Sequence, residues 1–413
     1  MSLSSNIWLG YSEAQEWPSG LAGRDPLRLA HVSDALADAL VPGMTNQTQR
    51  SAYFKIIALA YDPEITDGLQ EYSLDKVEQI LLLERAWTIG LFLTGQLKDA
   101  TSAGEPEEGA AGRKSYEHIY GVRRASRHAA EVEEWRFNRL LEPDCILINQ
   151  RGTGGYGYYH VTMETLGLQG DDFSSAVVFN KKNRFEVARA LCRKWRGIRG
   201  TGKTRWAMER LAWWVPLGIP DRADKIIKNR VLQNDLRNNL YRSVRKLVRC
   251  RWDEKMALLE LRKHPLMGKM AKVILVWERF ARKALSIFSD VCGWAERGET
   301  RGRGLDCRDE ARGAFEALSS CSDVLLAEDP LYDFLKKAQF CRGKELLTEL
   351  VNYHVEAQKL KNRMPWVYMT RGGPRLCLSQ PGISVPPRGG LVHGYRIYSL
   401  CRLLRDTRAG GFR

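Results

Sequence analysis

Residues 25–57 read DPLRLAHVSDALADALVPGMTNQTQRSAYFKII, and they decide the fold class because two helical patterns follow each other there. Asp25-Pro26 predicts the start of a helix, since proline favours the first helical position. Apolar residues then recur at helical spacing, at Leu29, Val32, Leu36 and Leu40. Pro42-Gly43 predicts the end of this helix, and Tyr53, Ile56 and Ile57 indicate a second one.

The pattern continues as helices over most of the chain. Ser73 is expected to cap a third helix that carries Ile80, Trp87 and Leu91. Residues 99–114 are small and acidic, which is typical of a loop, and a long helix is expected over roughly 116–141. From Arg184 to about Glu356 the pattern is again helical, with interruptions at 215–220 and 298–304.

Two short apolar runs, Cys145–Ile148 and Ala176–Phe179, are expected to be strands. They enclose a glycine-rich loop, 152–157, and a short helix over 161–166, which suggests a small winged-helix-like unit. Near the C-terminus, residues 366–370 and 375–379 flank Arg371-Gly372-Gly373-Pro374, a sequence that favours a hairpin turn. A final helix is expected over 395–405.

The predicted class is therefore mainly α and multi-helical, with a winged-helix-like α+β unit in the middle and a C-terminal β-hairpin. Five segments are expected: an N-terminal bundle (1–98), an acidic loop (99–114), a helix with the winged unit and a basic loop (115–215), a helical domain (216–356), and the hairpin with the closing helix (357–413).

Composition indicates a cytoplasmic globular protein. Hydrophobic residues make up 44% and charged residues 27% of the 413 positions. The longest uncharged apolar stretch, Ala86–Leu97, is shorter than the ~20 residues that a membrane-spanning helix needs. The N-terminal residues lack the basic and apolar regions of a secretion signal. The nine cysteines form no CxxC pair, as expected of free thiols in a reducing compartment.

Positive charge is concentrated in residues 181–251. They hold 21 Lys and Arg against five acids, a net charge of +16, whereas the rest of the chain holds 43 against 44. Such a local field attracts phosphates or an acidic partner. Within Ile226–Val248 the apolar residues keep near-helical spacing, which predicts one amphipathic helix with a cationic face. A solvated helical face without a ligand is the alternative.

The residues expected to contact nucleic acid are the cations and one aromatic residue of this segment, with Trp195 as a second stacking candidate: Lys194, Arg196, Arg199, Lys203, Arg205, Trp206, Lys228, Arg237, Arg242, Arg245, Lys246 and Arg249.

Three short motifs match known chemistry. Gly197–Thr204 fits the P-loop pattern GxxxxGK[ST], but a cationic, helix-like run precedes it instead of a buried strand. Gly152–Gly157 fits GxGxxG, but no acid follows the next strand-like run. Arg123–His128 has the RxxxxH spacing of HEPN-type ribonucleases, and Arg388–His393 fits the same spacing. No ligand cluster for a metal and no cofactor motif with the right context is found.

Residues 42–54 contain PGxTNxTxRxxYF, which resembles the N-terminal signature of an uncharacterised family of bacterial proteins found in anti-phage defence islands. Further similarity lies in the glycine- and tyrosine-rich stretch 152–159, the LGL at 166–168, Trp366 and the final helix. The resemblance implies membership in a defence system and no particular chemistry.

The residues of the signature also have a local interpretation. Thr45 or Asn46 is expected to cap the second helix. Arg50 would then lie near the positive end of that helix, and it needs either a bound anion or an acid of the chain itself.

Together these features predict a non-catalytic subunit of a multi-protein bacterial defence complex that binds nucleic acid, DNA in preference to RNA, through residues 181–251. Other subunits of that complex are expected partners, and a membrane is not. One alternative is a scaffold subunit that binds an acidic protein. A second is a HEPN-like ribonuclease effector that uses Arg123 and His128.

Overall fold

The computed structural model describes residues 25–70, 73–96, 120, 150–192, 201–217, 219, 221–299, 301–302, 304–321, 324, 327–377 and 390–407. These residues confirm the predicted class, since helices dominate and a two-stranded antiparallel hairpin lies near the C-terminus. The chain divides into two compact units. Unit 1 comprises Met1–Leu40 and Lys246–Tyr395, and unit 2 comprises Val41–Arg245 and Arg396–Arg413.

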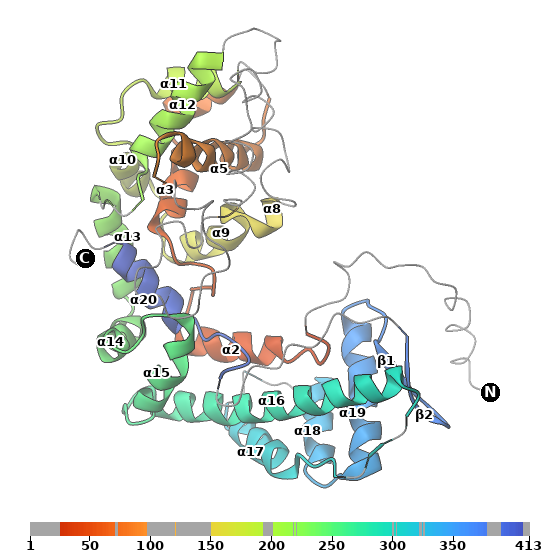
Figure 1. Ribbon diagram of the computed structural model, residues 1–413. Helices are drawn as coiled ribbons and strands as arrows, with labels where there is room; N and C mark the ends of the chain where they lie inside the picture. Colours follow the sequence, from red (N-terminus) through yellow and green to blue (C-terminus); the bar gives the residue numbers. More distant parts are fainter. Residues whose placement is uncertain are drawn as a thin grey trace. The chain divides into compact units, whose positions relative to one another are not determined.

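Unit 1 is built around one long helix, α16, which packs against α2, α15, α17, α19 and β2 (Figure 1). Its elements are α2 (Ala30–Leu40), the 3₁₀ turn η4 (Arg251–Asp253), α15 (Glu254–Leu261), α16 (Gly268–Glu296), α17 (Arg308–Ser319), α18 (Pro330–Ala338), α19 (Gly343–Leu360), β1 (Val367–Thr370) and β2 (Gly373–Leu376).

The helix α2 begins at Ala30 and not at Pro26 as expected, because the chain first makes a turn in which Arg28 has a positive φ of 50°. The Asp25 carboxylate accepts the backbone N–H groups of Leu29 and Ala30, at 2.9 and 3.0 Å, and so satisfies donors that a helix start leaves unpaired. The apolar face of α2 packs on α16, where the buried indole of Trp277 donates to the hydroxyl of Ser33 at 2.8 Å.

The hairpin is anchored to the core of unit 1 through His354 on α19. One ring nitrogen of His354 bonds the Pro26 carbonyl at 2.8 Å, and the other accepts the backbone N–H of Trp366, also at 2.8 Å. β1 and β2 pair from Val367 with Leu376 to Thr370 with Gly373, so Arg371-Gly372 makes the predicted turn. The second strand begins two residues earlier than expected.

Unit 2 consists of helices among its described residues. They are α3 (Ser51–Leu59), α4 (Pro63–Gln70), α5 (Lys76–Leu93), α8 (Gln150–Thr153), α9 (Gly155–Thr165), α10 (Asp171–Val178), α11 (Arg184–Cys192), α12 (Thr201–Trp214), α13 (Arg222–Leu232), α14 (Asp235–Val244) and α20 (Ile397–Asp406).

The packing of unit 2 places α3 at its centre, in contact with α5, α9, α10 and α13. All nine residues of α3 are buried, in keeping with the mostly apolar sequence of this helix. α12 packs along α5, and the indole N–H of Trp87 donates to the carbonyl of Val215 at 2.8 Å. α13 contacts α10, and α14 contacts α13 and the closing helix α20.

Local predictions are wrong at Ala176–Phe179 and at Ser73. Ala176–Phe179 is not a strand, because Ala176–Val178 form the end of α10, a helix that begins with Asp171 and Asp172 in its first turn. The other expected strand of the winged unit, Cys145–Ile148, and the helix over 116–141 lie outside the described residues. Ser73 does not cap α5, because Asp75 does so in a capping box with Glu78.

The expected single helix over 226–248 is two helices. The Asn234 side chain accepts the backbone N–H of Arg237 and starts α14, so the chain turns between Leu232 and Asp235. The amphipathic pattern itself is confirmed at Ile227, Val231 and Leu240, which are fully buried.

Candidate nucleic-acid interface

In residues 181–251, most of the described Lys and Arg side chains are exposed, whereas most of the acidic side chains are not. Among the described residues of this segment, eleven Lys and Arg are exposed: Lys182, Arg189, Lys203, Arg210, Arg222, Lys225, Arg242, Arg245, Lys246, Arg249 and Arg251. Only two acids are exposed there, Glu186 and Asp235. The exposed side chains of the segment are therefore more one-sided in charge than the sequence count alone indicates.

The acids of the segment are drawn inward by partners. The buried ammonium of Lys55 on α3 lies 2.9 Å from Asp224 Oδ2 and 3.4 Å from Asp221 Oδ2, at the start of α13. Burial alone would lower the pKa of Lys55, but the two carboxylates more than offset it and raise the pKa. Glu209 pairs with Arg205 at 3.0 Å on α12.

The structure contradicts one predicted phosphate contact, Arg237. Its side chain is buried, and its guanidinium donates to three carbonyl oxygens: Val231 and Pro42 at 2.8 Å and Arg230 at 3.3 Å. Arg237 thus satisfies the carbonyl end of α13 and ties it to the turn before α3. Its position on the helical wheel suggested exposure, because the break at Asn234 could not be seen in the periodicity.

The remaining candidates lie in separate places. On α12, Lys203 is exposed and Trp206 is half-buried, with the guanidinium of Arg210 6.0 Å from its ring. Lys228 is half-buried on α13. Lys194, Trp195, Arg196 and Arg199, with the first half of the P-loop match, lie outside the described residues.

At the end of α14 the arginines Arg242 and Arg245 are exposed. The carbonyl of Arg245 accepts a hydrogen bond from the Arg405 guanidinium of α20 at 3.1 Å, so a third arginine is held beside them within unit 2. A cation near a helix C-terminus is favoured by the helix dipole, and these three residues form a small basic patch.

The second segment of unit 1 begins at Lys246 with another basic patch, which contains an exposed aromatic ring. Lys246, Arg249, Arg251 and Trp252 are exposed, with 55% of Trp252 accessible. The Asp253 carboxylate is turned toward the backbone, where it accepts the N–H groups of Arg249 and Cys250 at 2.8 and 2.9 Å. Those bonds lower the pKa of Asp253 against the opposing effect of burial, and they fix the turn that presents the cations.

The face shared by α10 and α13 in unit 2 was not predicted from the sequence. Phe179, at the end of α10, is 56% exposed, and the guanidinium of Arg222 lies 5.3 Å from its ring centroid. Lys225 is exposed one turn further along α13. The only signal in the sequence is that Phe179 directly precedes Asn180-Lys181-Lys182. The predicted strand over Ala176–Phe179 did not indicate that this ring lies on a cationic surface.

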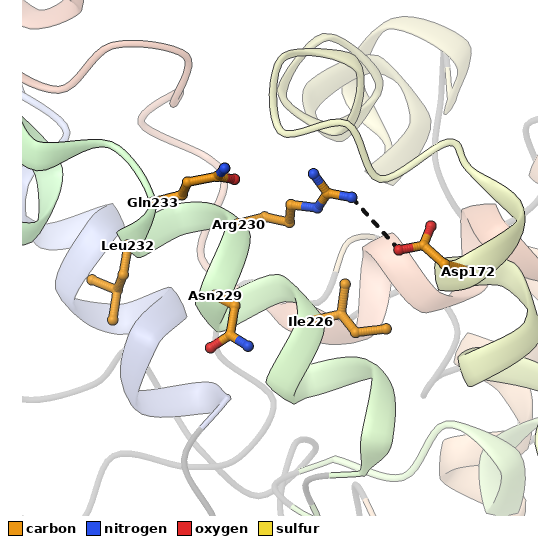
Figure 2. Close-up of a pocket in the computed structure, with 6 residues that line it drawn as sticks. All are labelled: Asp172, Ile226, Asn229, Arg230, Leu232 and Gln233. Carbon is orange, nitrogen blue, oxygen red and sulfur yellow. Dashed lines mark ion pairs between the residues drawn. The ribbon is translucent and has the colours of Figure 1, made fainter.

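Figure 2 shows a hollow on this face, between α10 and α13. Its volume is about 530 Å³, and it is lined by Asp172, Ile226, Asn229, Arg230, Leu232 and Gln233. Arg230 reaches from α13 toward Asp172 of α10, and their charged atoms are 3.5 Å apart. The hollow therefore combines an ion pair, two amides and two aliphatic side chains.

Lys181 adds a titratable group close to this face. Burial lowers its pKa to about 8, with Asp221 opposing and Lys55 and Arg184 adding to the shift. Its amine is thus charged at neutral pH and becomes neutral in mildly alkaline solution.

The TNxTxR residues form a buried network in place of an open anion site. Arg50 is paired at 2.9 Å with Asp406 at the end of α20, and Asp406 also accepts the N–H and the hydroxyl of Ser51 at 2.7 and 3.0 Å. The anion expected at the start of α3 is therefore a carboxylate of the chain itself. Of the two partners expected for Arg50, a bound anion or an acid of the chain, the structure has the acid.

Thr45 and Asn46 do not cap α3, because that helix begins only at Ser51. The Thr45 hydroxyl lies 2.7 Å from that of Thr48, and the Asn46 side chain accepts the backbone N–H of Arg396 at 3.1 Å. The Tyr159 hydroxyl accepts the backbone N–H groups of Gln49 and Arg50, both at 2.8 Å. The motif therefore joins α3, α9 and α20.

The glycine motifs have structural explanations in the described residues. In the GxGxxG stretch, a Cβ on the motif glycine Gly154 would lie 2.6 Å from the carbonyl oxygen of Gln150. Gly155, between two motif glycines, allows α9 to approach α3 closely, because a Cβ there would lie 2.1 Å from the ring of Tyr53. At the end of the P-loop match, the buried Thr204 hydroxyl donates to the Ala190 carbonyl of α11 at 3.3 Å. The last described element before this motif is the helix α11, whereas a P-loop follows a strand.

Neither RxxxxH match is fully placed. Arg123, His128 and Arg388 lie outside the described residues. His393 is held by the buried carboxylate of Glu278, 2.7 Å from its Nδ1, and the Tyr395 hydroxyl donates to the same carboxylate at 2.7 Å. This arrangement fixes the orientation of the imidazole in unit 1. Across the described ranges, no group of three or more His, Cys, Asp or Glu side chains is placed to hold a metal ion.

Comparison of the chain with protein-family models, with curated proteins and with solved structures gives no match. Among the helices that the structure describes, none is long and apolar enough to cross a membrane.

Proposed function

We propose that this protein binds nucleic acid through its phosphate backbone, with the exposed cations of residues 181–251 as the contacts. The observation that carries the proposal is the separation of charge: eleven exposed cations against two exposed acids in the described part of the segment. Cations arranged in this way displace the counterions of a phosphate chain, and that release favours binding.

The aromatic residues strengthen this proposal against a purely acidic protein partner. Phe179 lies exposed beside Arg222, and Trp252 lies exposed beside Arg249 and Arg251. Rings interleaved with cations serve single-stranded nucleic acids, because bases stack on the rings while the cations hold the phosphates. The proposal also includes DNA as the preferred nucleic acid and a non-catalytic role. The PGxTNxTxRxxYF resemblance adds only the setting, a multi-protein bacterial defence complex.

The experiment is a fluorescence-anisotropy titration of the full chain against a labelled single strand of about 12 nucleotides, repeated with a duplex and with RNA. In the test variant, Arg222→Gln and Lys225→Gln are combined. In the control, Lys263→Gln and Lys359→Gln remove the same charge from exposed sites outside the segment.

We expect the test variant to bind about tenfold or more weakly, because two phosphate contacts are lost, and the control to bind within about twofold of the wild type. Equal losses in both variants would show that only net charge matters. Undiminished binding of polyglutamate in the presence of excess DNA would favour the scaffold alternative.

A further inference from the structure

We propose that the hollow between α10 and α13 holds one unpaired adenine base of the bound strand. This inference rests on the proposed function and goes beyond it, because phosphate contacts alone are indifferent to sequence. The hollow, about 530 Å³ in volume, is built from side chains of α13 and from Asp172 of α10 (Figure 2).

The amides in the hollow favour a base edge as the ligand. Asn229 lies on α13, and Gln233 directly follows the helix with helical backbone angles. Four residues apart, they are neighbours on one helical face, and both are exposed. A side-chain amide offers a donor and an acceptor side by side, which matches the N6 and N7 positions of adenine. Guanine is read best by a free guanidinium, but Arg230 in this hollow is already paired with Asp172 at 3.5 Å.

The other lining residues suit the faces of a flat ring. Ile226 and Leu232 contribute aliphatic surface, and the planar guanidinium of Arg230, held in place by Asp172, offers a stacking surface. A base can enter such a hollow only when it is unpaired, since in a duplex both ring faces are covered by neighbouring bases.

Two cations on α13 lie one helical turn from the hollow, where the phosphate of the same nucleotide can contact them. Arg222 and Lys225 each precede a hollow residue, Ile226 and Asn229, by one helical turn, which is about 6 Å along the axis of α13. Both cations are exposed, and Arg222 lies over the ring of Phe179. One nucleotide can therefore place its base on Asn229 and its phosphate on Lys225.

The test compares labelled oligo(dA) and oligo(dT) of about 12 nucleotides, and oligo(dA) with abasic sites in place of its central bases. We expect the wild type to prefer oligo(dA) by about fivefold or more, the discrimination that one good bidentate pair provides. Asn229→Leu combined with Gln233→Leu should remove this preference and retain the salt dependence of binding.

The two proposals fail in different ways. If oligo(dA), oligo(dT) and the abasic strand bind equally and the salt dependence remains steep, the base site is refuted and phosphate binding stands. If no strand binds, the proposed function itself is refuted. A mononucleotide arm with AMP distinguishes the source of the base: competition at micromolar concentration would assign the hollow to a free nucleotide and overturn a strand-bound base.

A second readout does not depend on affinity. 2-Aminopurine placed once in the strand should lose fluorescence when it stacks in the hollow, and the Asn229→Leu/Gln233→Leu variant should restore most of it. Because both side chains are exposed, we expect this variant to keep the wild-type circular dichroism spectrum. Unchanged fluorescence in the wild-type complex would contradict the proposal.

Discussion

Replacing Asp406 with Asn tests whether the TNxTxR motif that precedes α3 is a structural junction. In the native protein the Arg50 guanidinium and the Asp406 carboxylate are both nearly buried, with 6% and 9% of their side chains exposed. Removing one partner of a buried ion pair costs about 3–5 kcal/mol, because the other charge is left without compensation. Asn retains one acceptor oxygen for Ser51, so we expect a loss of about 3 kcal/mol, at the lower end of that range.

The assay is urea unfolding, followed by far-ultraviolet circular dichroism and tryptophan fluorescence. Glu209→Gln is the control in the same unit, because it breaks the half-exposed pair with Arg205, for which we expect a loss under about 0.5 kcal/mol. If Asp406→Asn were as mild as this control, the interpretation of Arg50 as part of a structural junction would be refuted, and an anion site at the motif would need to be reconsidered.

Three further predictions concern single positions. Burial lowers the pKa of His354 to about 4, so on acidification this histidine takes up a proton at a higher pH in the unfolded chain than in the folded one. The unfolding free energy should therefore fall by about 3 kcal/mol between pH 6.5 and pH 4. In urea unfolding, the midpoints of His354→Gln should lack this part of the decline. Gly155→Ala should lower the melting temperature, because its methyl group would overlap the ring of Tyr53, whereas Gly202→Ala, with open space around it, should leave it unchanged or raise it. Nucleic-acid affinity should weaken between pH 7 and pH 9 as Lys181 loses its charge, and Lys181→Arg should remove that dependence in the anisotropy titration.

The parts of the fold that could be predicted from the sequence are those fixed by neighbouring residues. The helix ended by Pro42-Gly43, the long helical run that became α16, the hairpin around Arg371-Gly372 and the closing helix all follow from local periodicity and turn chemistry. Each of these signals lies within one or two turns of the backbone that it controls.

The errors arose where a local signal is ambiguous. The apolar run Ala176–Phe179 fits a strand or a short helix equally well, and two acids at the start of α10 favoured the helix. A helical wheel cannot show that Asn234 caps a new helix, so the predicted cationic helix continued through the turn and Arg237 was placed on the wrong side.

The site could be predicted only in part, because its geometry depends on distant pairs. Composition located the charge, and the structure adds which charges are compensated. Lys55 pairs with Asp221 and Asp224, which lie about 170 residues further along the sequence. Asp406 reaches Arg50 across 356 positions. The α10–α13 hollow needs both helices in place before its lining exists.

The salt dependence of binding tests the central claim most directly. We expect the affinity of the full chain for a single strand to fall linearly in a log–log plot between about 50 and 200 mM salt, with a slope of about −3 or steeper, since each phosphate contact on a single strand contributes about −0.7. The slope should become shallower by more than one when Arg222 and Lys225 are both replaced by Gln. An affinity that is unchanged over this range would show that phosphates are not the ligand of the exposed cations of residues 181–251.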